Sequence, residues 1–415
     1  MLGAVMAPEY ASAQRPLSLA DAQAEARAHA PETAELDARV GGAEAQAAQA
    51  RRRFRTDPEI SGSLFQGALI GRPDEHTWII GASQLFDISG SWKPRAASAD
   101  ADLDRARLDR EDGLRALDQR VAGAVADVAL AQRLVAWNER ITALAQLAAD
   151  AARRQFDVGQ ASQFDADAAA LDLAGAKSAT EQGRGDLDRA KWRLARLLGR
   201  QTTDLSVEDP PETAELPIAP EFAALVDRDP RVRGAEAEVR AARFENDMFQ
   251  RLITPSPIFG IDYSRVRRDI PAGSFAGTAL APGLTANWAD SELLFSVGVP
   301  LPLFNRQREN RARTTTRMLA ADARMRIAQA DVRAELESSW ADLQTAARAY
   351  RALAPTSEVI MRDAQFVEQA VQAGAFDTTT RTQALRRLED AERHLDTAVR
   401  DVRTTRAAWI RRSLQ

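Results

Sequence analysis

The stretch from Arg306 to Gln372 constrains the fold more than any other part of the chain. It contains no glycine and a single proline, Pro355, so we expect only that residue to interrupt a helix. Apolar residues recur in it at seven-residue steps, the spacing of a left-handed coiled-coil seam. One stripe is Met318, Met325 and Val332, and a second is Leu336, Leu343 and Tyr350. At 1.5 Å per residue, about 65 helical residues extend about 100 Å, which predicts a rod or the wall of a tube.

Two such stretches each fold back on themselves. We expect Gly374 to end the rod that begins at Arg306, and Gly159 to end an earlier helix that runs from about Pro94 to Asp157. Glycine readily adopts the left-handed conformation that terminates helices. Return helices are predicted from Thr380 to Arg412 and from Gln163 to Leu198. The seven-residue spacing recurs at Leu388, Leu395, Val402 and Trp409, and at Leu114, Val121, Val128 and Val135. The sequence therefore predicts two long antiparallel helical hairpins.

Composition excludes several classes of protein. The chain has 415 residues, of which 45% are hydrophobic but only 6% aromatic, and its net charge is -5. A phosphate-binding surface needs clustered positive charge, so we expect no nucleic-acid partner. The absence of cysteine excludes disulfides, thiolate metal sites and cysteine nucleophiles.

The remaining segments give the same order of elements twice. We expect helix from Leu17 to about Arg53, with a break near Pro31, and again from Glu221 to about Leu252. Paired strands follow each helix and precede each hairpin. The four strands are predicted at Ile60–Ile70, Trp78–Ile88, Ile258–Arg265 and Leu293–Leu303, with a Gly/Pro-rich loop from Asp269 to Asp290. The order indicates a duplication, with repeats at residues 14–200 and 221–415 and a proline-rich linker at 201–220.

The N-terminus resembles the remnant of a secretion signal at residues 1–13. Leu2 to Met6 is apolar, and Ala11 and Ala13 fit the small-residue positions of a cleavage site before Gln14. We therefore expect export, with a mature protein that begins at Gln14. No other apolar run reaches the roughly 18 residues of a membrane-spanning helix.

The strands alternate in a way that favours a membrane. Segments of about ten residues with one apolar and one small or polar face are typical of a lipid-facing β-barrel, although a sheet covered by protein would alternate too. We expect Phe259, Ile261 and Tyr263, with Leu293, Phe295 and Val297, to face lipid. Four strands cannot close a barrel, and in lipid every sheet edge must be paired. A membrane location would therefore require the protein to oligomerise.

The chain resembles the TolC-like outer-membrane efflux family from Leu17 to Arg412. The segments that carry the resemblance are VGVPLPLFNRQREN (297–310), LFDISG (85–90), FDVGQASQFDADAA (156–169) and QAGAFDTTTRTQAL (372–385). The resemblance implies a mainly helical fold with some β structure, in which a homotrimer forms a twelve-stranded outer-membrane barrel continued by a periplasmic helical tunnel. It also implies a passive exit duct that works with a periplasmic adaptor and an inner-membrane pump of the resistance-nodulation-division class. PLPLFNR resembles members paired with cobalt-zinc-cadmium pumps, which implies divalent metal cations as cargo, with drugs as the alternative.

The gate of the tunnel departs from the family pattern. Family members often narrow the periplasmic entrance with aspartates six and nine residues after the second tip glycine, where this chain has Thr380 and Gln383. The first tip instead offers Asp165 and Asp167 after Gly159. These two carboxylates are candidates for an acidic constriction, but they are also explained as residues that stabilise the start of a helix.

No catalytic or metal-binding motif is present. The three histidines, His29, His76 and His394, lie far apart in sequence, and no phosphate-binding or nucleophile motif occurs. We therefore expect neither enzymatic activity nor a cofactor. A periplasmic coiled-coil scaffold without channel activity remains the alternative to an export duct.

Overall fold

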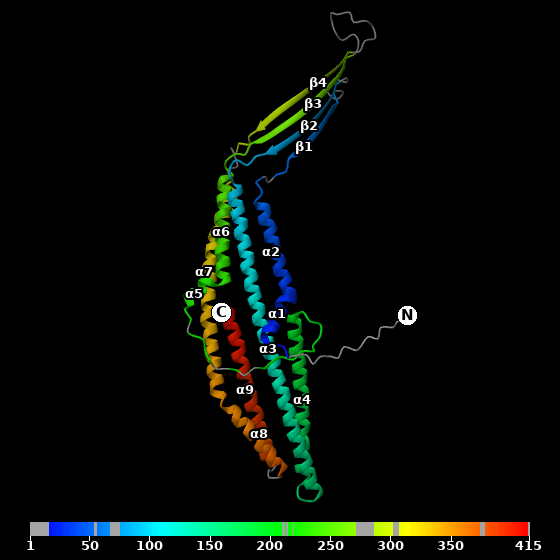
Figure 1. The fold of residues 1–415 in the computed structure, drawn as a ribbon, viewed down its shortest axis with the longest axis vertical. Helices are drawn as coiled ribbons and strands as arrows, with labels where there is room; N and C mark the ends of the chain where they lie inside the picture. The colour runs from blue at the N-terminus through cyan, green and yellow to red at the C-terminus, as the bar shows by residue number, and fades with distance from the viewer. Residues whose placement is uncertain are drawn as a thin grey trace, which may run out of the picture. The chain divides into compact units, whose positions relative to one another are not determined.

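The computed structural model describes residues 16–53, 56–66, 75–209, 212, 215–218, 220–270, 286–301, 307–373 and 378–413. The predicted leader, Gly374 and residues 302–306 lie outside these ranges. Helices account for most of the described chain, and Figure 1 shows them with a single group of four strands. Among the described residues, the helices are α1 (Leu19–His29), α2 (Pro31–Ala50), α3 (Trp92–Asp157), α4 (Gln163–Leu198), α5 (Phe222–Arg228), α6 (Pro230–Arg251), α7 (Arg308–Leu353), α8 (Thr356–Gln372) and α9 (Thr378–Ser413).

The predicted hairpin helices are confirmed, with their ends close to the expected residues. α4 has the expected bounds because Ser162 caps its first turn and Gly199, with φ of +72°, closes its last. The expected break at Pro355 separates α7 from α8. The helical segment predicted from Glu221 to about Leu252 is confirmed, but it is divided at Pro230 into α5 and α6. Pro230 lacks an amide hydrogen and starts α6, while the Asp229 carboxylate accepts a hydrogen bond from the Arg231 amide at 2.8 Å.

The strands form one antiparallel sheet in the order β1 (Glu59–Gln66), β2 (Glu75–Leu85), β3 (Ile258–Ile270) and β4 (Ala286–Gly298). β2, β3 and β4 differ from prediction, whereas β1 begins within one residue of its expected start and its expected residues 67–70 lie outside the described ranges. β2 begins at Glu75 rather than Trp78 and ends at Leu85 rather than Ile88. β3 continues five residues beyond the expected end at Arg265, and β4 begins before Leu293 and ends at Gly298 rather than Leu303. Both ends of the predicted 269–290 loop are therefore strand. The register explains this, because β3 and β4 pair along their whole length from Ile258–Gly298 to Ile270–Ala286.

The chain forms two compact units, each assembled from both halves of the sequence. The first contains the described residues within 1–39, 107–233 and 326–415, and the second those within 40–106 and 234–325. The sheet belongs to the second unit. There, the predicted seam residues Met318 and Met325 pack on a small cluster that contains Val239, Ala242 and Ala321.

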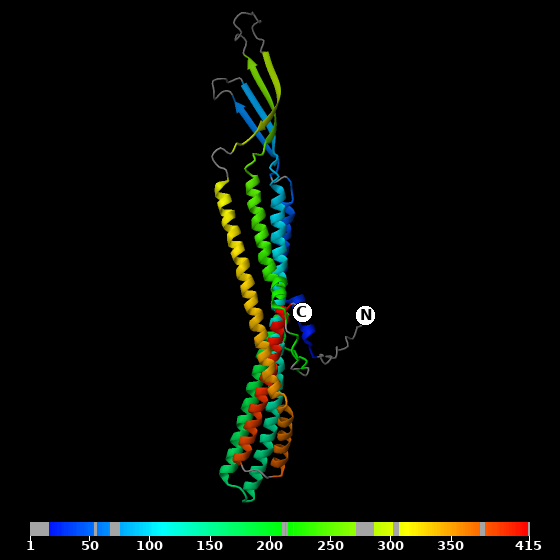
Figure 2. The same cartoon turned by 90° about the vertical axis from the view of Figure 1, so that its left-hand side faces the viewer.

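The first unit is a bundle built along α3. In both views α3, α4, α8 and α9 run side by side, and α3 and α8 end where α4 and α9 begin, at the same end of this bundle (Figure 1 and Figure 2). Most predicted heptad positions of this unit are buried in its cores, whereas Leu114, Val135 and Tyr350 are only half-buried. The largest fully buried side chains of the unit include Val121, Val128, Leu194, Leu198, Val332, Leu336, Leu343, Val402 and Trp409.

The N-terminal segment is held to the chain that follows α4. Leu17, which was expected to be helical, instead pairs in extended conformation with Val207. The Leu17 amide donates to the Ser206 carbonyl at 2.8 Å, and the Glu208 amide donates to the Leu17 carbonyl at 3.0 Å. The start of the first repeat is thereby attached to the start of the linker.

Candidate functional site: an amphipathic sheet and the hairpin tips

The sheet has one apolar face that is exposed. In an antiparallel pair, residues directly opposite each other point to the same side, so the register assigns each residue to a face. Ile261 lies opposite Phe295, Tyr263 opposite Leu293, and Phe259 opposite Val297. This apolar face comprises Ile60, Leu64, Trp78, Ile80, Ala82, Phe259, Ile261, Tyr263, Leu293, Phe295 and Val297. Phe295 is 72% exposed in the single chain, so the protomer leaves a continuous apolar surface uncovered.

Aromatic pairs lie toward the two ends of the apolar face. The rings of Trp78 and Tyr263 are 5.4 Å apart in an edge-to-face arrangement. The rings of Phe86 and Phe259, near the end of the sheet that leads to α3, are 5.3 Å apart with an interplanar angle of 86°. Trp and Tyr are enriched where membrane proteins cross the lipid–water interface.

The opposite face of the sheet is polar and closely packed through glycines. A Cβ atom at Gly81 would lie 2.0 Å from an Asp262 carboxylate oxygen, and one at Gly260 would lie 2.4 Å from the Ser296 hydroxyl. These glycines therefore make room for polar side chains of the neighbouring strand. The same polar face carries Glu59, Asp262, Asp290 and Glu292.

The first hairpin tip positions the two candidate gate carboxylates on α4. Gly159, with φ of +75°, turns the chain after α3. Asp165 completes a capping box, in which its amide donates to the Ser162 hydroxyl at 3.2 Å and its carboxylate accepts from the Ser162 amide at 3.2 Å. Asp167 accepts from the Gln163 side chain at 2.8 Å. Both carboxylates thus have a local structural role.

The second hairpin tip is described only on its two helices. α8 ends at Gln372 and α9 begins at Thr378, whereas Gly374 lies outside the described residues. Thr380 and Gln383 are on the first turns of α9 and are exposed. The structure therefore places these two candidates at the same end of the bundle as Asp165 and Asp167 (Figure 2).

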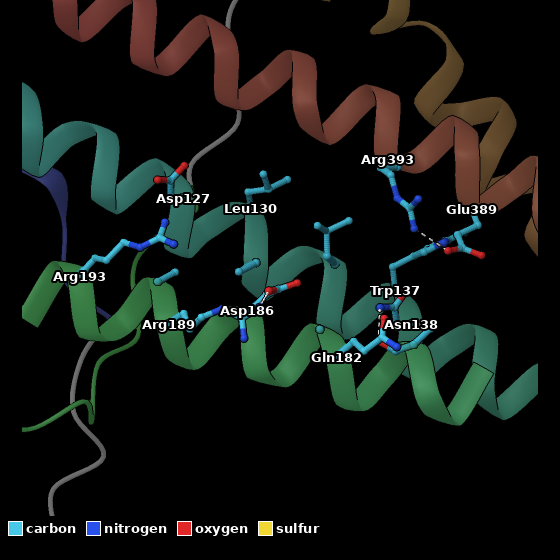
Figure 3. Close-up of a pocket in the computed structure, with 15 residues that line it drawn as sticks. Asp127, Leu130, Trp137, Asn138, Gln182, Asp186, Arg189, Arg193, Glu389 and Arg393 are labelled. Atoms are coloured by element: carbon cyan, nitrogen blue, oxygen red, sulfur yellow. Dashed lines mark hydrogen bonds and ion pairs between the residues drawn. The ribbon is translucent and has the colours of Figure 1, made fainter. Parts of the chain in front are cut away.

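A groove of about 410 Å³ lies between α3, α4 and α9. Figure 3 shows its walls, in which charged side chains of opposite sign stand next to one another. Arg393 donates to Glu389 at 2.7 Å, and Arg189 is paired with Asp186. These two pairs match charge along the walls of the groove, and Asp127 pairs with Arg400 beyond it.

The linker contributes a charged cluster that the sequence did not predict. Arg403 of α9 donates to Asp209 at 2.7 Å and to Glu212 at 3.2 Å, and Arg406 also pairs with Glu212. Arg133 of α3 pairs with Asp209 and donates to Asp396 at 3.2 Å. Burial opposes ionisation, but hydrogen bonds from Arg133 and Arg403 hold the pKa of Asp209 below its usual value.

Asp396 is the exception in this cluster. Its side chain is 1% exposed, and its Oδ2 atom has no hydrogen-bond partner among the residues that the structure describes. Burial raises the pKa of Asp396, and the hydrogen bond from Arg133 offsets only part of that effect. Burial likewise raises the pKa of Glu392, one turn earlier on α9, and the charge of Asp396 adds to the increase.

Within the described ranges, no three His, Cys, Asp or Glu side chains are arranged to hold a metal ion. None of the helices in the described part of the chain combines the length and apolar composition needed to cross a bilayer.

Solved structures of bacterial channel proteins share this fold. CusC, whose structures concern transmembrane channel formation, is 17% identical with a TM-score of 0.74 over 95% of this chain and 91% of that chain. The outer-membrane channel OprN is 20% identical with a TM-score of 0.72 over 95% of this chain and 89% of that chain. The outer membrane protein VceC from Vibrio cholerae is 19% identical with a TM-score of 0.66 over 95% of both chains.

No curated protein sequence matches the chain significantly. The profile of the outer membrane efflux protein family, in contrast, matches residues 22–200 and 223–411. These two ranges confirm the predicted duplication and the predicted TolC-like resemblance. The chain belongs to the outer membrane efflux protein family and is a protein of the cell outer membrane with a periplasmic helical portion.

Proposed function

We propose that three copies of this chain form a passive exit duct of a tripartite efflux system. The observation that carries this proposal is the sheet, which has four strands, one exposed apolar face, and β1 and β4 as its edges. In lipid the backbone groups of both edges must be paired, and four strands are too few to close a barrel. Pairing β1 of one protomer with β4 of the next would close a ring, and three copies would supply twelve strands.

In this arrangement the apolar face contacts lipid and the polar face lines the duct. Phe259, Ile261 and Tyr263, with Leu293, Phe295 and Val297, would form the middle of the lipid-facing belt. The alternative orientation would bring the carboxylates of the polar face into hydrocarbon, where each charge costs several kcal/mol.

We further propose that the cargo is cationic, either a divalent metal ion or a positively charged drug. The polar face carries Glu59, Asp262, Asp290 and Glu292, and rings of carboxylates favour the passage of cations. An inner-membrane pump of the resistance-nodulation-division class and a periplasmic adaptor would deliver the cargo to the helical end of the duct.

The tips of the hairpins would form the periplasmic entrance of the duct. Three copies of Asp165 and Asp167 would place six carboxylates around it, with Thr380 and Gln383 as uncharged neighbours from the second hairpin. Gly159 would provide the turn that brings α3 and α4 to this entrance.

Reconstitution of the purified protein in planar bilayers tests the duct and its gate. Wild type should assemble as a heat-sensitive trimer in the outer-membrane fraction and conduct ions with cation preference. The double variant Asp165→Asn, Asp167→Asn keeps one acceptor oxygen at each position to support the helix start but removes the charge, so it should lower cation selectivity and weaken block by divalent ions. A monomer in the soluble fraction would refute the duct. A conducting trimer with unchanged selectivity would refute only the acidic entrance and leave both residues as helix-start groups.

A further inference from the structure

Two arginines continue the apolar face of β3 at the end of the sheet where β3 leads to β4. After Tyr263, the next positions on this face are Arg265 and Arg267, and both are exposed. On β2, Trp78 lies opposite Arg265, and His76, also exposed, lies opposite Arg267. The apolar face therefore ends at the aromatic pair of Trp78 and Tyr263, and arginine and histidine side chains occupy the positions beyond this pair. We call Arg265, Arg267 and His76 the basic rim.

From Glu59 to Gln66, His76 to Leu85, Ile258 to Arg267 and Ala289 to Gly298, charges of opposite sign lie on different faces of the sheet. In the part of the sheet whose side chains the structure describes, the carboxylates Glu59, Asp262, Asp290 and Glu292 all lie on the polar face. The arginines of the same part lie on the apolar face. This arrangement suits a face that meets a surface which is apolar at one depth and anionic at the next.

The position of the basic rim fits the outer leaflet of the membrane. The helices α3 and α6 join the sheet at the opposite end, which faces the periplasm. Arg267 is four residues beyond Tyr263, which at about 3.3 Å per residue is about 13 Å along the strand. Tyr and Trp mark the interface, so the guanidinium groups extend past the hydrocarbon to the depth of the headgroups.

We propose that the basic rim binds phosphate groups of the phosphorylated glycolipid in the outer leaflet. Arginine suits this role because its planar guanidinium donates two parallel hydrogen bonds to a phosphate and retains its charge at any physiological pH. The occupant also needs acyl chains, because the apolar face continues directly below the rim. The inference rests on the proposed lipid contact of that face, and three copies would place three such rims around the barrel.

Native mass spectrometry of the purified trimer, titrated with bisphosphorylated lipid A or with its dephosphorylated form, tests this proposal. Wild type should bind the phosphorylated form more tightly. The double variant Arg265→Gln, Arg267→Gln should lose that preference, with affinity lower by about fivefold per arginine and about 25-fold in total. Arg265→Lys with Arg267→Lys should retain most of the affinity, because the charge remains. A matched control is Arg311→Gln with Arg313→Gln, which removes two exposed arginines from α7 and should change nothing.

Three results would count against the basic rim. Equal binding of the two lipid forms by wild type would overturn it without any variant. Equal binding of phosphorylated lipid by wild type and the glutamine variant would overturn it as well. Competition by millimolar inorganic phosphate with the same strength as by lipid A would point to a free-anion site and exclude the lipid.

Protein that never reaches the outer membrane would instead refute the proposed function. A trimer in the outer membrane that binds both lipid forms equally would refute the basic rim alone.

Discussion

The proposed orientation of the sheet predicts opposite consequences for two neighbouring residues of β4. Leu294 and Phe295 are both large, apolar and exposed, by 54% and 72%, but they point to opposite faces. Phe295 lies opposite Ile261 in the middle of the apolar face, whereas Leu294 lies opposite Asp262 on the polar face. Replacing each in turn with arginine therefore adds the same charge to opposite faces, and the smaller effect of losing the Phe295 ring is measured separately with Phe295→Leu.

The expected difference follows from the cost of charge in lipid. An arginine on the lipid side of a barrel near the bilayer midplane costs about 2–4 kcal/mol, so Phe295→Arg should reduce the equilibrium for insertion by about 30-fold or more per protomer. Three copies in a trimer would multiply the effect. Leu294→Arg places the guanidinium opposite Asp262, where a cross-strand pair of opposite charge contributes about 0.2–1 kcal/mol of stabilisation.

The assay is the amount of trimer in the outer-membrane fraction, read from unheated and heated samples on a gel, with total protein measured in parallel. Phe295→Leu serves as the control for loss of the ring, and it should assemble normally. We expect little or no trimer for Phe295→Arg and near-normal trimer for Leu294→Arg. Equal trimer levels for the two arginine variants, or loss only for Leu294→Arg, would refute the assignment of the apolar face to lipid.

Two further predictions concern the first unit. Gly199→Ala should destabilise the protein by about 2–4 kcal/mol, because alanine disfavours φ of +72° and its Cβ atom would lie 2.6 Å from the His29 carbonyl oxygen. The matched change Gly123→Ala in α3 adds a Cβ atom that meets no other atom within 4 Å, so it should stabilise the protein by up to about 1 kcal/mol. Urea unfolding followed by circular dichroism checks both, and shifts of the same sign would contradict the argument. Burial raises the pKa of Asp396, so the folded state keeps the proton of this carboxyl group at a pH where the unfolded state has released it. The free energy of unfolding of wild type relative to Asp396→Asn should therefore rise as the pH falls from 7 through the raised pKa. A stability difference that is constant across pH would show that Asp396 does not titrate in this way.

The sequence predicted the long helices well because each carries its own signals. Ser162 and Gly199 cap α4, and Pro355 divides the second rod, so no distant contact was needed to locate these boundaries. The split at Pro230 was missed because the apolar pattern continues through it, although Pro31 in the first repeat gave the same signal. Helix boundaries thus depend on local chemistry that a single sequence displays.

The sheet and the linker cluster show what local patterns cannot predict. Alternation assigned residues to faces correctly within β3 but ended the strand at Arg265, since nothing nearby reveals that pairing with β4 continues through the arginines to Ile270. The contacts of Arg133 with Asp209 and Asp396 join residues that are 76 and 263 positions apart. Such pairs form only when the helices pack together, and no residue spacing along the sequence predicts them. The roles of Asp165, Asp167, Thr380 and Gln383 at an entrance remain predictions.

The proline between α7 and α8 has a consequence for symmetry. α3 is an unbroken helix of 66 residues, while its counterpart in the second half of the chain is divided into helices of 46 and 17 residues. The duplicated halves therefore have the same order of elements but unequal stiffness. A ring of three chains would present six hairpins of two alternating kinds, so its symmetry would be three-fold rather than six-fold. A partner protein that engaged every hairpin would have to recognise two different surfaces, whereas one that engaged each protomer once would need only a single mode of binding.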